Sequence, residues 1–114
     1  MTAAGRKHRG YATQRIAADA LRELFPYATA RGAGESGSDL MHTPGFAFEV
    51  KATARGDLLA ALRQAQANAQ PGESPVVIHR PNGYGPARVH DWVVAMSLGD
   101  FIDLIADPII GRST

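Results

Sequence analysis

The segment around Phe46-Ala47-Phe48-Glu49-Val50-Lys51 most constrains what this chain can fold into, because it predicts a strand that carries charge among apolar residues. Alternate side chains of a strand share a face, so Glu49 and Lys51 should point the same way. Charged residues are rarely buried without a partner. A Pro44-Gly45 turn precedes the strand, and a hairpin there would bring Asp39 alongside. Two carboxylates and an ammonium gathered at a strand end can hold a hard divalent cation and hydrolyse a phosphodiester.

Size and composition indicate one globular domain. The chain has 114 residues, enough to bury roughly two thirds of its unfolded surface. It is 45% hydrophobic and 20% charged, which argues against disorder. The net charge of +1 does not by itself indicate nucleic-acid binding. We expect a single domain over residues 1–114, in which residues 1–9 are a basic lead-in that can be flexible.

Several classes of site are excluded or disfavoured. The absence of cysteine excludes disulfides, zinc-thiolate sites and thiol catalysis, and it fits a cytoplasmic location. No apolar run has the length of a signal peptide or a membrane span, so we expect no membrane partner. The four histidines lack zinc-site spacing. Gly32, Gly34 and Gly37 precede a strand rather than a helix, so we expect no nucleotide cofactor.

Hydrophobic periodicity and turn residues predict alternating elements. Helices are expected over 12–25, 57–69 and 98–106, and strands over 27–31, 38–42, 46–53, 75–80 and 87–97. Thr13 and Asp57 are candidate helix caps, and Pro26 and Pro108 should stop the first and last helices. The apolar run Val76-Val77-Ile78 predicts a buried central strand. The order αβββαββα describes a mixed α/β domain with a central sheet.

An Asp, a turn, and Glu-x-Lys on the next strand, followed by a helix, resemble the PD-(D/E)XK nuclease superfamily. More narrowly, the chain resembles archaeal-type Holliday junction resolvases and the small resolvase-like nucleases of actinobacterial phages. The resemblance covers about Gly10 to Ile105. It includes a Gly-x-x-x-(Glu/Gln)-Arg opening of the first helix, an Arg- and Gly-rich loop with serine before Asp39, and a glutamine on the following helix. It implies a restriction-endonuclease-like αβββαβ core, with a mixed central sheet flanked by helices.

The resemblance also implies roles for individual residues. Asp39 and Glu49 would bind Mg²⁺ or Mn²⁺, with the backbone carbonyl of Val50 as a further ligand, and Lys51 would orient or activate the attacking water. Gln64 would face the site from the second helix, although a surface amide is an equal alternative. Ser36, with Ser38, would lie in a loop near the scissile phosphate, although a turn role is as well supported.

One position departs from the family pattern. The first helix of the resolvases carries a glutamate that contributes to the metal site, and the matching residue here is Gln14. A glutamine brings no charge, so the cation would be held less tightly, or one ion would replace two. Glu23, on the same helix, should point away from the site, whereas Glu35 in the loop could reach it.

The implied activity is that of a metal-dependent DNA endonuclease, most simply a phage-encoded Holliday junction resolvase. Such an enzyme works as a homodimer, because it makes two symmetric cuts. The basic residues that could contact phosphate are Arg6, Lys7, Arg9, Arg15, Arg31, Arg55 and Arg63. Tyr84 could stack on an exposed base, although a turn role is favoured. Two alternatives remain open: a nuclease of the same superfamily acting on flaps or other branched DNA, and a catalytically idle DNA-binding module.

Overall fold

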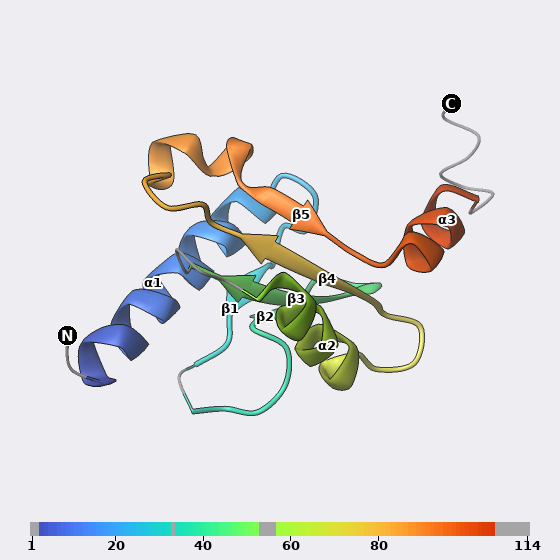
Figure 1. Cartoon of the computed structure of the whole chain (residues 1–114), viewed down its shortest axis with the longest axis horizontal. Helices are drawn as coiled ribbons and strands as arrows, with labels where there is room; N and C mark the ends of the chain where they lie inside the picture. Colours follow the sequence, from blue (N-terminus) through green and yellow to red (C-terminus); the bar gives the residue numbers. More distant parts are fainter. Residues whose placement is uncertain (1–2, 33, 53–56, 107–114) are drawn as a thin grey trace.

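The computed structural model describes residues 3–32, 34–52 and 57–106, with side chains described from residue 10 onward. In chain order the elements are α1 (Ala3–Leu21), β1 (Thr29–Ala30), β2 (Leu40–Met41), β3 (Phe46–Lys51), α2 (Leu58–Asn68), β4 (Ser74–His79), a 3₁₀ segment η1 (Pro86–Asp91), β5 (Val93–Ala95) and α3 (Leu98–Ala106). The architecture is mixed α/β with helices flanking a sheet (Figure 1), and the order of helices and strands agrees with the prediction.

In the described part of the chain, the central sheet has three strands in the order β3-β4-β5. Strands β3 and β4 are parallel, and β5 runs antiparallel to β4. The predicted central strand is confirmed, because β4 lies in the middle and its residues Val76, Val77 and Ile78 are buried. Helix α2 provides the crossover that a parallel pair requires. The short strands β1 and β2 form a separate antiparallel pair.

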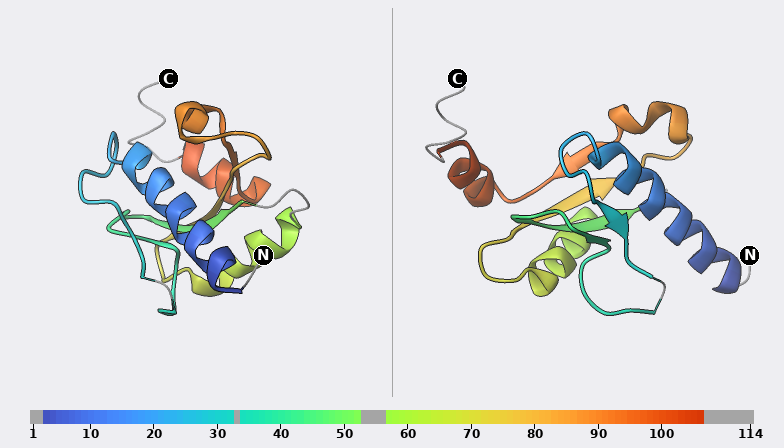
Figure 2. Two further views of the ribbon diagram at one scale, coloured as in Figure 1. Left: turned by 90° about the vertical axis from the view of Figure 1, so that its left-hand side faces the viewer. Right: turned by 180° about the vertical axis from the view of Figure 1, so that it is seen from behind.

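The two faces of this sheet contact different helices (Figure 2). Phe48 and Val50 of β3 pack in the main core cluster with Ala17 and Ala18 of α1. The alternate residue Ala47 is also fully buried, and α2 contacts both β3 and β4. Both faces of β3 are therefore covered, which is why even its charged residue Glu49 loses most of its solvent exposure.

Helix α1 differs from the predicted helix at both ends. It begins at Ala3, so the backbone of the basic lead-in is helical from that residue, and it ends at Leu21, ahead of Pro26. Thr13 is not a cap, because it lies within the helix and is only 1% exposed. Its hydroxyl accepts a hydrogen bond from Arg80 Nη1 at 3.0 Å. The cap prediction was wrong because the helix begins well before Thr13, at Ala3. The Thr13 hydroxyl therefore bonds to a distant arginine and not to the N-terminal turn of its own helix.

Helix α2 begins as predicted. The Asp57 carboxylate accepts a hydrogen bond from the N–H of Ala60 at 3.0 Å, which satisfies one of the free donors of the first turn. The helix buries the small residues Ala61 and Ala65, whereas Leu58 is 45% exposed. Small residues at this contact let the helix lie close to the sheet and leave its larger side chains near solvent.

The strand predicted over 87–97 is mostly wrong. Pro86 opens the 3₁₀ segment, and only Val93–Ala95 pair with β4. Trp92 is buried as a core residue should be, but Val94 is 62% exposed. The sequence of this segment is apolar because it forms an apolar edge of the sheet. No described part of the chain covers that edge.

Helix α3 forms over the predicted residues, yet none of its residues is buried. Its apolar side chains Leu98, Phe101, Ile102 and Ile105 are 46–73% exposed. In Figure 1 the helix stands away from the sheet beyond β5. These apolar residues therefore do not belong to the core that the described chain forms. Pro108 and the residues after it lie outside the described part, as does Thr53.

No helix in the described part of the chain combines the length and the apolar character needed to cross a membrane.

Candidate active site

Asp39 lies immediately before β2 and is fastened to the free edge of β3. Its backbone N–H donates to the carbonyl of Phe48 at 3.0 Å, and its Oδ2 accepts from the N–H of Val50 at 2.8 Å. On the other side, the N–H of Arg31 donates to the Asp39 carbonyl at 2.8 Å. Asp39 therefore connects the β1-β2 pair to the central sheet, and its carboxylate has a defined position beside β3.

Glu49 and Lys51 share a face of β3, as predicted. Lys51 Nζ lies 3.0 Å from Glu49 Oε1. The Glu49 side chain is only 6% exposed, whereas that of Lys51 is 42% exposed, so the pair runs from the protein interior to solvent at the end of the strand. Phe48 and Val50 point into the core from the opposite face. The Glu49–Lys51 pair therefore lies on a strand that is covered on both faces, close to the strand edge to which Asp39 bonds.

Burial raises the pKa of both carboxylic acids. For Asp39, removal from water is the main cause, and it is opposed by the Val50 N–H and by the positive charges of Lys51 and Arg31. For Glu49, the pKa is raised first by burial and then by the negative charge of Asp39, while Lys51 opposes both. The negative charge of Asp39 therefore acts on Glu49. A cation placed between the two carboxylates would stabilise their charged forms and so offset the cost of burial and the repulsion.

Gln14, Glu35 and Asp39 line one hollow of about 300 Å³, together with Tyr11 and Arg31. Gln14 reaches it from α1, which agrees with its expected place beside Asp39. Glu35 reaches it from the loop, also as expected. Glu23 lies elsewhere, because its Oε1 contacts His90 Nε2 at 2.9 Å. Of the two acids considered from the sequence, Glu35 lines this hollow and Glu23 does not.

The oxygen donors present fit a hard cation that keeps much of its water. Among the described residues, no group of three or more His, Cys, Asp or Glu side chains could hold a metal. Mg²⁺, however, is commonly bound through one or two carboxylates, with water and substrate phosphate as the other ligands. Asp39 and Glu49 supply these two carboxylates. The Lys51 carbonyl accepts from the N–H of Arg80, which follows β4. Successive carbonyls of a strand point to opposite edges, so the Val50 carbonyl faces the Asp39 edge.

The remaining predicted site residues are more dispersed. Ser36 is exposed and Ser38 is half-buried in the loop before Asp39. Gln64 is exposed on α2, which is the surface position that the alternative assigned to it. Arg15 and Arg63 are exposed, on α1 and α2 respectively. Arg55 and the side chains of Arg6, Lys7 and Arg9 lie outside the described residues.

The side chains of Tyr84 and His42, which lie in or near loops, have surroundings other than the carboxylate site. The guanidinium of Arg88 lies 3.7 Å from the ring centroid of Tyr84, so one face of that ring is already covered. His42 has a φ of 63° and lines a different hollow from the one that Asp39 lines. Neither residue joins the carboxylate site.

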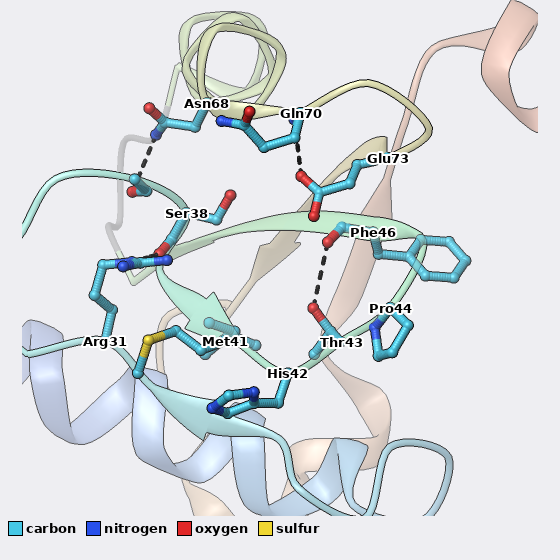
Figure 3. A pocket seen from close by; sticks show the side chains of 12 residues that line it. Arg31, Ser38, Met41, His42, Thr43, Pro44, Phe46, Asn68, Gln70 and Glu73 are labelled. Atoms are coloured by element: carbon cyan, nitrogen blue, oxygen red, sulfur yellow. Dashed lines mark hydrogen bonds between the residues drawn. The ribbon is translucent and has the colours of Figure 1, made fainter.

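Periodicity and motif spacing missed the contacts that hold the loop before Asp39. Arg31 Nε donates to the Ser38 carbonyl at 2.5 Å, and Asn68 Nδ2 donates to the Gly37 carbonyl at 3.2 Å (Figure 3). Asn68 ends a helix of otherwise ordinary composition, and its partner is 31 residues away. The glycine at 37 was the available signal, since a φ of 110° suits glycine alone.

Comparisons of this chain with protein-family models, with curated proteins and with solved structures gave no match. The function of the chain must therefore be inferred from the geometry of Asp39, Glu49 and Lys51.

Proposed function

We propose that this protein is a metal-dependent endonuclease that hydrolyses phosphodiester bonds in DNA, with a four-way (Holliday) junction as its substrate. The observation that carries the proposal is the arrangement of Asp39, fixed to the Val50 N–H, beside the Glu49–Lys51 pair on the same strand. The Asp39 carboxylate is held by the backbone of β3, and Glu49 and Lys51 are held by each other, so the set is preorganised in the folded chain.

Asp39 and Glu49 would hold Mg²⁺ or Mn²⁺, with the Val50 carbonyl and the amide of Gln14 as neutral oxygens nearby. The bound cation would act as a Lewis acid on a phosphate oxygen and lower the pKa of a water molecule. Lys51 would donate a hydrogen bond to the attacking water and offset negative charge on the phosphate. Its side chain is 42% exposed, which suits a group that must meet an incoming substrate.

DNA binding would use exposed basic side chains around this site. Arg15 and Arg63 are exposed on the two helices that flank the sheet. Arg31 lines the Asp39 hollow and could contact a phosphate there. Phosphate contacts position a nucleic acid without reading its sequence, which is appropriate for an enzyme that recognises DNA shape.

A homodimer is part of the proposal, because resolution of a four-way junction requires paired cuts. Strand β5 is an edge of the sheet, and Val94 on it is largely exposed. Beyond it, α3 presents Leu98, Phe101 and Ile102 to solvent. An apolar strand edge and an uncovered apolar helix are both surfaces that a second copy could bury. Two active sites would then belong to one assembly.

The decisive experiment incubates the purified protein with Mg²⁺ or Mn²⁺ and four DNA substrates of matched sequence: a four-way junction, a flap, a linear duplex and a single strand. We expect cleavage of the junction at paired positions and its loss when the metal is chelated. Preferential cleavage of the flap would support a branched-DNA nuclease of other specificity. Binding of DNA without cleavage of any substrate would refute the enzymatic proposal and favour a DNA-binding module.

A further inference from the structure

Two backbone carbonyls of the loop that leads to Asp39 accept hydrogen bonds from side chains on opposite sides of the loop. On one side, Arg31 Nε donates to the Ser38 carbonyl at 2.5 Å. The same guanidinium lies against Gly37, where an added Cβ would come within 3.1 Å of Arg31 Cζ. Gly37 also has a φ of 110°, a conformation that suits glycine, and its close contact leaves little room for a side chain.

On the other side, Asn68 Nδ2 donates to the Gly37 carbonyl at 3.2 Å. Figure 3 shows Asn68 and Arg31 approaching the loop from opposite sides of Ser38. Asn68 is the last residue of α2, and that helix is packed on β3 and β4. The helix end that carries its carboxamide is therefore positioned by the same sheet that carries Glu49 and Lys51.

These contacts form a continuous series along the backbone. The Gly37 carbonyl is bonded to α2, the Ser38 carbonyl to Arg31, and the Asp39 N–H to Phe48 of β3. The series ends at the residue whose carboxylate accepts from the Val50 N–H. Without Asn68, the Gly37 carbonyl loses the side-chain donor that the structure shows, and the bonds described here that remain at residues 38 and 39 come from Arg31 and β3.

We infer that Asn68 is a positioning residue that acts through the Gly37 carbonyl to hold the Asp39 carboxylate against β3. The inference rests on the proposed function in one respect, namely that the Asp39 carboxylate binds a metal. Groups that orient a metal ligand without touching the metal commonly change affinity by about 10- to 100-fold when removed. Asn68 lies at a helix end and belongs to no motif of catalytic chemistry. Its role is therefore inferred from its contact with the Gly37 carbonyl.

The test compares Asn68→Ala with the control Gln66→Ala, which removes an exposed amide from the same helix. Alanine is the best helix former, so the first variant should fold. Two quantities are measured for the wild type and both variants: the affinity for Mn²⁺ by calorimetry, and hydrogen exchange at the amides of Val50 and Val77. The Val50 amide reports the Asp39 contact directly, and the Val77 amide reports the centre of the sheet.

We expect Asn68→Ala to weaken Mn²⁺ binding about tenfold. Exchange at Val50 should quicken, exchange at Val77 should stay unchanged, and Gln66→Ala should match the wild type in every quantity. Unchanged Val50 exchange in Asn68→Ala would overturn the inference. So would faster Val50 exchange with Mn²⁺ affinity unaltered, because the carboxylate would then move without consequence. A wild type that binds no Mn²⁺ would refute the proposed function and, with it, the metal-positioning role, while Val50 exchange would still show whether Asn68 holds Asp39.

Discussion

The Asp39 carboxylate accepts a hydrogen bond from the backbone N–H of Val50 at 2.8 Å, at the edge of β3 where a neighbouring strand would otherwise supply a carbonyl. Two residues back along β3, the carbonyl of Phe48 accepts from the Asp39 N–H at 3.0 Å. The side chain thus continues a ladder that the backbone of Asp39 begins. A buried N–H left without an acceptor is costly, so this contact contributes to folding as well as to the site. It also decides which substitutions are informative: asparagine retains an acceptor oxygen, and alanine does not.

The first prediction concerns catalysis. Asp39→Asn, Glu49→Gln and Lys51→Ala should each reduce DNA cleavage by at least about a hundredfold, because each removes a charge placed at the reacting phosphate. The matched control is Asp19→Asn, which removes an exposed carboxylate paired with Arg22 on α1. Cleavage rates with Mg²⁺, and circular dichroism to verify folding, provide the measurement. Near-normal cleavage by any of the three variants would contradict the proposed site.

The second prediction concerns the metal. Gln14 lines the same hollow as Asp39, so Gln14→Glu would add a negative charge beside the ligand set. We expect tighter binding of Mn²⁺ in a calorimetric titration, since affinity for hard cations increases with the charge of the ligands. An affinity equal to that of the wild type would place Gln14 outside the metal site.

The third prediction concerns pH. The pKa of Asp39 is raised by burial above its ordinary value of 3.8, so the folded state binds a proton more readily than the unfolded chain. Stability attributable to this group is therefore present below that value and is lost as the pH rises through the raised pKa. In chelator at neutral pH, Asp39→Asn should be at least as stable as the wild type, by up to about 1 kcal/mol.

The pH prediction is measured by thermal unfolding of both proteins between acidic and neutral pH. Any advantage of Asp39→Asn should shrink as the pH falls, because the wild-type carboxyl is then protonated in both states. A wild type that gains stability over the variant as the pH rises would show that the carboxylate is stabilised by its surroundings, contrary to the assigned direction.

The fourth prediction concerns DNA affinity. The helix α1 includes Arg6, Lys7 and Arg9, so replacing all three by glutamine removes charge while keeping good helix formers. If they contact phosphates, the slope of log affinity against log salt should become shallower by about 1 to 3, since each contact adds about 0.9. Fluorescence anisotropy with a labelled junction at several salt concentrations measures the slope. The same slope in both proteins would remove these residues from the interface.

The fifth prediction concerns assembly. Phe101 and Ile102 of α3 are 48% and 55% exposed, so a double substitution to serine should leave the fold of one chain intact. We expect the wild type to scatter light as a dimer at micromolar concentration and the variant as a monomer. The monomeric variant should lose paired cutting of junctions. A monomeric wild type that still makes paired cuts would exclude this dimer surface.

The sequence by itself determined the features that depend on near neighbours. Alternation along 46–51 placed Glu49 and Lys51 on one face, and the structure confirms their pairing at 3.0 Å. Asp57 could be recognised as a cap because its acceptor and donor are three residues apart. The order of helices and strands followed for the same reason, since each depends on periodicity within a short window.

The tertiary structure alone decided the features that depend on distant partners. Thr13 lies mid-helix and bonds through its hydroxyl to Arg80, 67 residues away. The apolar residues of α3 are exposed because no described element of the chain covers them, although their pattern suits a core equally well. The position of the Asp39 carboxylate, held by the Val50 N–H and by a loop that Asn68 contacts, arises only when three separate segments meet. Periodicity in the sequence specifies which face of a helix or strand a side chain occupies, whereas the tertiary structure determines which groups it contacts there.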